Sequence, residues 1–193
     1  MTFGAVILAG GKSRRMGRDK AQLIYDGSDF LSRLALSLSG FSERLLSVAE
    51  IRPDTPPGFS QVIDEHRSLG PISGLLSALN GCKSDALLFV PCDVPLFTKE
   101  LADYLCSLLE EGYDAVIAVS KDGQEHPLCA VYRKSTVPFF RAALDRGDRR
   151  IFSALDGMRL RKARIWEAGF PDRLLLNINS PEEYALLCQE GGK

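Results

Sequence analysis

Short runs of consecutive apolar residues recur along this chain, and longer amphipathic segments separate them. The runs lie at Ala5–Leu8, Leu45–Val48, Ala86–Val90 and Ala115–Val119. Because these runs show almost no polar alternation, they are typical of strands that are buried on both faces. The pattern therefore predicts a mainly parallel sheet.

Three segments between these runs place leucines at the spacing of one helix face. They are residues 30–38, residues 70–79 and a segment that contains Leu101, Leu105, Leu108 and Leu109. For the third segment, Thr98 is a suitable N-cap and Gly112 a suitable stop. Alternating strands and helices predict an open α/β sandwich.

The pattern changes after about residue 120. Residues 121–135 (KDGQEHPLCAVYRKS) indicate a hairpin or an edge strand interrupted by Pro127, and two short helices are expected at 137–144 and 151–155. A last strand is expected at 174–179. The sequence Ser180-Pro181-Glu182-Glu183 is a capping box with proline at the first helical position, which predicts the start of the terminal helix. We expect both halves to share one sheet.

Composition narrows the class of protein. With 193 residues, 45% of them apolar, and a net charge of -1, the chain suits one globular domain over residues 1–193, although two small subdomains are also compatible. A near-neutral charge argues against a general nucleic-acid or membrane-surface binder. Five cysteines without a C-x-x-C pair indicate reduced core thiols and no zinc site. Apolar runs stay below the roughly 18 residues that span a membrane, so we expect a soluble, cytoplasmic protein.

The segment ILAGGKSRRMGRDK (residues 7–20) suggests where a ligand binds. A predicted strand leads into a glycine-rich turn, followed by five cations: Lys12, Arg14, Arg15, Arg18 and Lys20. Mutual repulsion disfavours this crowding unless an anion lies among the cations, and a polyphosphate fits best. The spacing matches neither the dinucleotide fingerprint nor the Walker loop. The alternative is a solvated basic loop that closes a tight turn.

The pattern L-A-G-G-x-S-x-R-M-G-x-D-K, from Leu8 to Lys20, resembles the signature of the molybdenum cofactor guanylyltransferases, within the nucleotidyltransferase superfamily. The resemblance continues in order through Asp64 before Gly70-Pro71, Pro91-Cys92-Asp93-Val94-Pro95, His126-Pro127-Leu128 and Asn177-Ile178-Asn179-Ser180-Pro181-Glu182. It implies a three-layer α/β/α Rossmann-like nucleotidyltransferase fold with a mainly parallel sheet.

The resemblance also implies an activity, namely transfer of GMP from GTP to molybdopterin with release of pyrophosphate. Mg²⁺ would be the cofactor, and transient contacts with cofactor-biosynthesis or acceptor enzymes are expected. Two alternatives stay open. One is a related enzyme that uses CTP or another small acceptor, and the other is an accessory module that binds GTP without turnover. Gly10-Gly11 favours the guanylyl branch, because a missing methyl group admits a purine base more easily.

Site residues follow from the resemblance, position by position. Leu8, Ala9, Gly10 and Gly11 would hold the nucleotide, Lys20 would neutralise phosphate charge, Asp64 would contact the nucleoside, and Asp93 would bind Mg²⁺. Among the five cations we favour Arg14 and Lys20 for catalysis. The asparagine that the family often has near the end of the second strand is absent, since that region reads Ser47-Val48-Ala49-Glu50.

Physical chemistry supports some of these roles and leaves alternatives for others. Asp93 ends an apolar strand, where an uncompensated carboxylate is costly, and a single aspartate can suffice for Mg²⁺. Alternatively, Asp93 caps the turn before Pro95. Glu65 competes with Asp64 for the nucleoside role. Ser13 is a weak nucleophile candidate, because the sequence fixes no base beside it.

A second basic region, from Arg146 to Arg164, suits an anionic acceptor, although solvated helix faces are the usual place for arginines. We assign acceptor binding to Arg149, Arg150, Asn177 and Asn179, with the alternative that both asparagines satisfy backbone groups at a strand end. The N-terminal part of the chain, about residues 1–120, would then bind the nucleotide, and the C-terminal part, about residues 121–193, would bind the acceptor.

Overall fold

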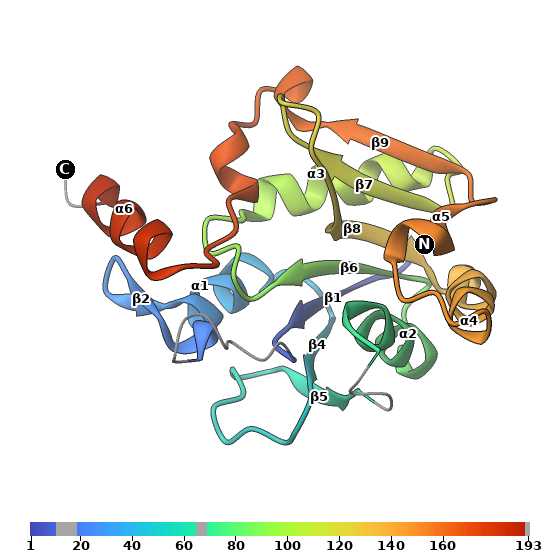
Figure 1. The fold of residues 1–193 in the computed structure, drawn as a ribbon, viewed down its shortest axis with the longest axis horizontal. Coiled ribbons are helices and arrows are strands. Elements are labelled where there is room, and N and C mark those ends of the chain that lie inside the picture. Colours follow the sequence, from blue (N-terminus) through green and yellow to red (C-terminus); the bar gives the residue numbers. More distant parts are fainter. Residues whose placement is uncertain (11–18, 65–68, 192–193) are drawn as a thin grey trace.

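The computed structural model describes residues 1–10, 19–64 and 69–191. Within them, a central seven-stranded sheet has the strand order β5-β4-β1-β6-β8-β7-β9 (Figure 1). Its strands are β1 (Phe3–Leu8), β4 (Glu43–Val48), β5 (Ser60–Ile63), β6 (Ala86–Pro91), β7 (Ala115–Val119), β8 (Glu125–Arg133) and β9 (Leu160–Arg164). A small hairpin of β2 (Ile24–Tyr25) and β3 (Ser28–Asp29) lies apart from this sheet. The two halves of the chain thus share one sheet, as expected.

Most neighbouring strands are parallel, but β8 runs antiparallel to both β6 and β7. Residues 121–135 therefore hold a turn and β8, which is the second strand of a hairpin whose first strand, β7, lies before the predicted range. The edge-strand alternative is wrong, because β8 lies inside the sheet. Pro127 is tolerated there at an irregularity. The register shifts between Ile117 and Ala118, which pair with Ala130 and His126, so Pro127 lies in the bulged stretch and leaves no ladder donor missing.

Helices cover both faces of the sheet, which confirms the three-layer α/β/α architecture. Side chains of β1 alternate between the faces: Ala5 and Ile7 join one buried cluster with α1 (Phe30–Ser37) and α3 (Lys99–Glu110), whereas Val6 joins the other. That second cluster includes α2 (Pro71–Gly81), α4 (Val137–Asp145) and α5 (Ile151–Leu155), which lie together in Figure 1. The predicted cap is also present, since the Thr98 hydroxyl accepts a hydrogen bond from the amide of Leu101.

The C-terminal segment departs from the predicted strand at 174–179. Residues Asp172–Leu175 form a 3₁₀ helix, and the following residues cross the ends of strands without joining the sheet. Leu174 and Leu175 are both buried, which suits a turn and not the alternation of a strand. The buried Ile178 then packs with Leu23, Phe30 and Leu187 in a third cluster. This cluster attaches α6 (Pro181–Gly191) to the N-terminal part of the chain, and α6 begins with the predicted capping box.

Four of the five cysteines, Cys82, Cys92, Cys106 and Cys129, are buried or half-buried free thiols, as expected for core residues. Cys188 differs, because it lies exposed on α6. Across the described part of the chain, every helix is too short or too polar to traverse a lipid bilayer.

Candidate functional site

Three distant segments bring Lys20, Asp93 and Asn179 together. The ammonium of Lys20 lies 2.9 Å from Asp93 Oδ2 and 2.6 Å from Asn179 Oδ1. Lys20 and Asp93 keep only 14% and 20% of their side chains exposed. Two oxygen atoms thus converge on one cation in a half-buried place at the carboxyl end of β6, where open α/β sheets bind ligands.

The backbone around each of these residues explains the convergence. Asp93 follows β6, and its carbonyl oxygen accepts a hydrogen bond of 2.8 Å from the amide of Ile178. This bond places the next residue, Asn179, beside Asp93. The amide of Asn179 donates to the carboxylate of Glu183 (2.5 Å), so the capping box of α6 also holds the asparagine in place.

The predicted nucleotide-binding residues at the end of β1 lie next to this cluster. The Leu8 carbonyl accepts a hydrogen bond from the amide of Cys92, and the amide of Ala9 donates to the carbonyl of Ser47 (2.8 Å). A methyl group on Gly10 would lie 3.4 Å from the backbone nitrogen of Ala49, so the chain passes close to the end of β4 here. Gly11 and Arg14 lie outside the described residues, as do Ser13 and the other three cations before Asp19.

Asp64 occupies a separate place, at the end of β5. Its amide donates to the carbonyl of Val48 (2.9 Å), and its carboxylate accepts a hydrogen bond from the hydroxyl of Ser73. Ser73 is buried in the first turn of α2. Because β4 and β1 lie between β5 and β6, about 14 Å separates the strand ends that carry Asp64 and Asp93. A ligand across the ends of β4 and β1 would reach both; Glu65 lies outside the described residues.

An arginine that the sequence analysis missed joins the turn of Lys20. Arg52 Nη1 lies 2.7 Å from Asp19 Oδ2, and its Nε and Nη2 lie 2.9 and 2.7 Å from the two oxygens of Asp54. The Arg52 guanidinium lowers the pKa of Asp54 to about 2, and Asp54 in turn raises the pKa of Arg52. No sequence motif identifies Arg52, because its contact with Asp19 arises only when the connection between β4 and β5 packs against the turn of Lys20.

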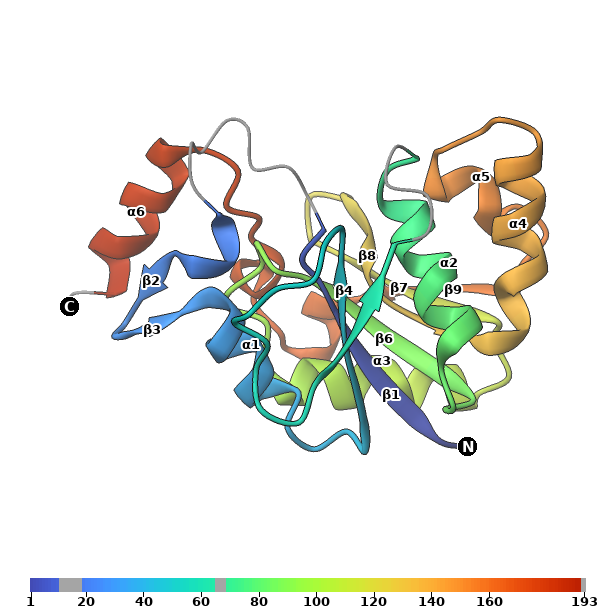
Figure 2. The same cartoon turned by 90° about the horizontal axis from the view of Figure 1, so that it is seen from below.

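The predicted acceptor-binding residues fall into two groups. Asn179 joins the Lys20 cluster, and Asn177 is half-buried two residues earlier. Arg149 and Arg150 are exposed on the connection between α4 and α5, which lies on the side of the molecule toward which β1 and β4 run (Figure 2). Arg150 forms a two-pronged ion pair with Asp148, at 2.8 and 3.1 Å.

His126 lies buried at the irregular start of β8, and its Nε2 is 3.3 Å from the hydroxyl of Ser120. Burial lowers the pKa of His126, an effect that nearby Asp122 and Asp172 partly oppose. The residue therefore serves the β7–β8 turn, whose Ser120 hydroxyl also donates to Asp122.

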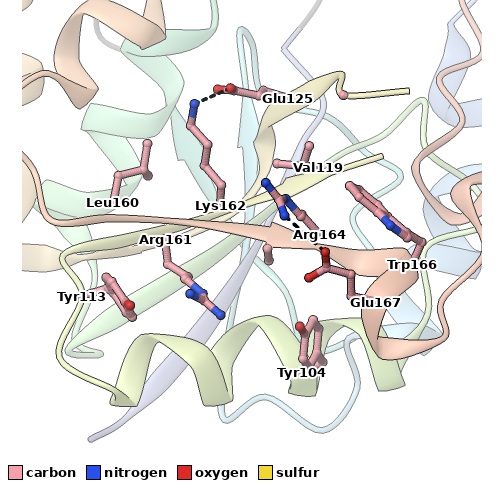
Figure 3. A pocket seen from close by; sticks show the side chains of 12 residues that line it. Tyr104, Tyr113, Val119, Glu125, Leu160, Arg161, Lys162, Arg164, Trp166 and Glu167 are labelled. Atoms are coloured by element: carbon pink, nitrogen blue, oxygen red, sulfur yellow. Dashed lines mark hydrogen bonds and ion pairs between the residues drawn. The ribbon is translucent and has the colours of Figure 1, made fainter. Parts of the chain in front are cut away.

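A groove of about 820 Å³ follows the edge strand β9 (Figure 3). Arg161 faces Tyr113 there, while Lys162 and Arg164 form ion pairs with Glu125 and Glu167. Part of the second basic region thus lies on a strand and not on a helix face. None of the predicted site residues lines this groove, so the convergence around Lys20, and not the groove along β9, defines the candidate site.

Comparisons with known proteins show which family this chain resembles. Residues 5–160 match the family described as MobA-like NTP transferase domain. A molybdenum cofactor guanylyltransferase of Shewanella sp. (strain ANA-3) is 33% identical over 98% of this chain and 97% of its own length. A probable molybdenum cofactor guanylyltransferase of Clostridium perfringens (strain SM101 / Type A) is 39% identical, over 68% of this chain and 66% of that relative.

Solved structures show the same fold. Molybdopterin-guanine dinucleotide biosynthesis protein A from Archaeoglobus fulgidus superimposes with a TM-score of 0.81 at 21% identity, covering 97% of both chains. The nucleotidyltransferase fold expected from the sequence is therefore confirmed. The match over most of the chain, together with relatives above 30% identity along nearly its full length, shows that this chain belongs to the family of MobA-like NTP transferase domains.

Proposed function

We propose that this chain is a guanylyltransferase, which transfers GMP from GTP to the terminal phosphate of molybdopterin and releases pyrophosphate. The observation that carries the proposal is the convergence of Lys20, Asp93 and Asn179 at the carboxyl end of the sheet, in a family of NTP transferase domains. An oxygen of the molybdopterin phosphate forms the new bond to the α-phosphorus of GTP, and the bond to the leaving pyrophosphate breaks. This chemistry requires no protein nucleophile.

Each residue then has a defined task. Negative charge builds up on the transferred group and on pyrophosphate, so a positioned cation stabilises the transition state, and Lys20 supplies it. We predict that Arg14 supplies a second such cation. Leu8, Ala9 and Gly10 would hold the nucleotide, with Gly11 predicted beside them. Asp64, whose carboxylate Ser73 orients, would accept a hydrogen bond from the nucleoside.

The residues present suit Mg²⁺. Asp93 and Asn179 already direct oxygen atoms at one cation, the Lys20 ammonium, and oxygen is the ligand that Mg²⁺ prefers. Within the described part of the chain, no three His, Cys, Asp or Glu side chains form a cluster. Asp93 would therefore hold Mg²⁺ together with water and substrate phosphate, a common arrangement for this ion. When bound, the ion would neutralise charge on the phosphoryl oxygens.

The acceptor would approach from the C-terminal part of the chain, residues of about 121–193, while residues of about 1–120 hold GTP. Asn179 and Asn177 would contact the acceptor near Lys20. Arg149 and Arg150 would attract its phosphate from the α4–α5 connection. The relatives named above are called molybdenum cofactor guanylyltransferases, which supports molybdopterin, the organic part of that cofactor, as the acceptor; enzymes that supply or receive it would contact this face transiently.

One experiment tests the function directly. Pyrophosphate release is measured from GTP, CTP and ATP, each with and without molybdopterin and with and without Mg²⁺. We expect release only with GTP, molybdopterin and Mg²⁺ together. A preference for CTP would indicate a cytidylyltransferase, and GTP binding without any release would indicate an accessory module; either result overturns the proposal.

A further inference from the structure

We infer that Arg52 is a positioning residue, which holds the turn that carries Lys20 and so fixes the direction of its ammonium toward Asp93 and Asn179. The inference builds on the proposed function in one respect, since it treats Lys20 as the cation that meets the phosphates. The contacts that support it are independent of any substrate.

The first link joins Arg52 to the turn. Lys20 begins the 3₁₀ turn Lys20–Gln22, and Asp19 is its N-cap. The two carboxylate oxygens of Asp19 have different partners. Its Oδ1 accepts a hydrogen bond of 3.0 Å from the amide of Ala21, while its Oδ2 lies 2.7 Å from Arg52 Nη1. Arg52 therefore fixes the cap that starts the turn, one residue before Lys20.

The second link fixes Arg52 itself. Its Nε and Nη2 form a two-pronged ion pair with Asp54, which limits rotation of the guanidinium plane. The side-chain amide of Gln61, on β5, receives a hydrogen bond from the Arg52 amide (2.9 Å) and donates one to its carbonyl (2.7 Å). Arg52 is thus held at both backbone and side chain, and only 15% of its side chain is exposed.

These links form a continuous connection from the sheet to the ammonium. It runs from β5 through Gln61, Arg52 and Asp19 to Lys20, and Gln22 adds a second contact with Asp54 at 3.3 Å. A lysine side chain is long and flexible, so its aim depends on a fixed backbone. Misplacement of a catalytic group by about 1 Å can lower the rate by about a hundredfold, so such support matters for transfer.

The first test needs no substrate. Acetic anhydride modifies exposed amines, and mass spectrometry measures the rate at Lys20 in the nucleotide-free protein. We expect Arg52→Ala to raise this rate several-fold. Asp19→Asn should do the same, because asparagine keeps the cap but loses the ion pair, and the double variant should show no further increase. Arg159→Ala is the matched control, since Arg159 also pairs with a carboxylate, that of Asp114, beside the start of β9.

An unchanged modification rate at Lys20 in Arg52→Ala and Asp19→Asn would overturn the inference, whatever the enzyme does. The second test uses GMP transfer. Arg52→Ala should lower kcat about tenfold or more with little change in KM for GTP, and Arg52→Lys should recover part of the loss. A raised KM for GTP with normal kcat would contradict positioning. If the unmodified protein transfers no GMP while Lys20 still becomes reactive in the variants, the proposed function fails and the positioning role stands.

Discussion

The ammonium of Lys20 lies 2.9 Å from the carboxylate of Asp93, although 73 positions separate them in the chain. Each compensates the charge of the other in a half-buried place, which explains how an aspartate can lie just after the apolar strand β6. Both groups also face the edge of the sheet where phosphates are expected. The pair therefore links the stability of the site with the chemistry proposed for it.

Asp93→Asn should abolish GMP transfer while the protein stays folded. Asparagine keeps the size of the side chain and an oxygen toward Lys20, but it lacks the negative charge that would hold Mg²⁺. We expect the rate of pyrophosphate release to fall about a hundredfold or more. Circular dichroism checks the fold, and Asp103→Asn on the exposed face of α3 is the control. Near-normal turnover of Asp93→Asn would show that the metal role is wrong.

Asn179→Ala should impair transfer more than Asn177→Ala. Both residues belong to the same predicted motif, but Asn179 has a hydrogen bond of 2.6 Å to the Lys20 ammonium. A hydrogen bond to a charged group contributes about 1.5–3 kcal/mol, so its loss corresponds to roughly a tenfold to hundredfold effect. Steady-state rates at saturating GTP and molybdopterin test this. An equal loss of rate in the two variants would show that the hydrogen bond from Lys20 to Asn179 does not matter for transfer.

Ser73→Ala should weaken GTP binding without changing turnover. The buried hydroxyl of Ser73 donates to the Asp64 carboxylate, and its loss leaves that carboxylate less well oriented. We expect KM for GTP to rise about tenfold, the equivalent of about 1.4 kcal/mol, with kcat unchanged. Ser77→Ala, one turn later on the same helix, is the matched control. If Glu65→Ala raises KM for GTP and both Asp64→Ala and Ser73→Ala leave it normal, Glu65 is the working residue.

The sequence predicts the fold well where local patterns decide structure. The apolar runs became the buried strands β1, β4, β6 and β7, while leucine spacing, Thr98 and the Ser180 capping box located α1, α2, α3 and α6. The strand predicted for residues 174–179 was wrong, because a run of apolar residues is compatible with any buried segment. Only tertiary contacts, such as the amide of Ile178 donating to the Asp93 carbonyl, distinguish a crossing segment from a strand.

The sequence predicted those site residues that belong to a recognisable motif. Asp93, Lys20 and Asn179 were each assigned from a motif, but their mutual contact depends on how three segments that are far apart in the sequence meet in the fold. Arg52 was not predictable, since arginines on connections are usually solvated and no local signal reveals a partner such as Asp19. The assignments of Gly11 and Arg14 stay predictions, because both lie outside the described residues.

The protein should lose stability as pH falls below about 6.5, through His126. Burial lowers the pKa of His126 in the folded protein, so the unfolded chain, with its ordinary value of 6.5, binds the proton first. The contribution of His126 to the free energy of unfolding is therefore constant above about pH 6.5 and declines as the pH falls below 6.5. Urea unfolding at pH 7.5 and pH 5.5 measures it.

His126→Asn removes the titration and should flatten the pH dependence of unfolding between those two values. His66→Asn is the control, since the chain contains two histidines. The same slope in the unmodified protein and in His126→Asn would contradict the assignment. Asp122 and Asp172 are the charged groups that oppose the shift, so Asp122→Asn should steepen the dependence.

Arg149→Ala should raise KM for molybdopterin and leave KM for GTP unchanged. Two anionic substrates repel one another, so separate cationic regions have to hold them, and we predict that the α4–α5 connection is the second region. Arg161→Ala is the control for general loss of positive charge. Although Arg161 belongs to the same basic stretch, its guanidinium lies over the ring of Tyr113 in the groove along β9, at the outer edge of the sheet.

Initial rates with each substrate varied in turn distinguish these effects, and the difference between the two arginine variants should persist at raised salt. A cation that only holds substrate changes KM, whereas one that acts on the transition state lowers kcat, as expected for Lys20→Ala. If Arg149→Ala changes KM for GTP alone, the α4–α5 connection serves the nucleotide and not the acceptor. If Arg161→Ala raises KM for molybdopterin and Arg149→Ala does not, the acceptor binds along β9, and the division of the chain into two binding parts has to be redrawn around that strand.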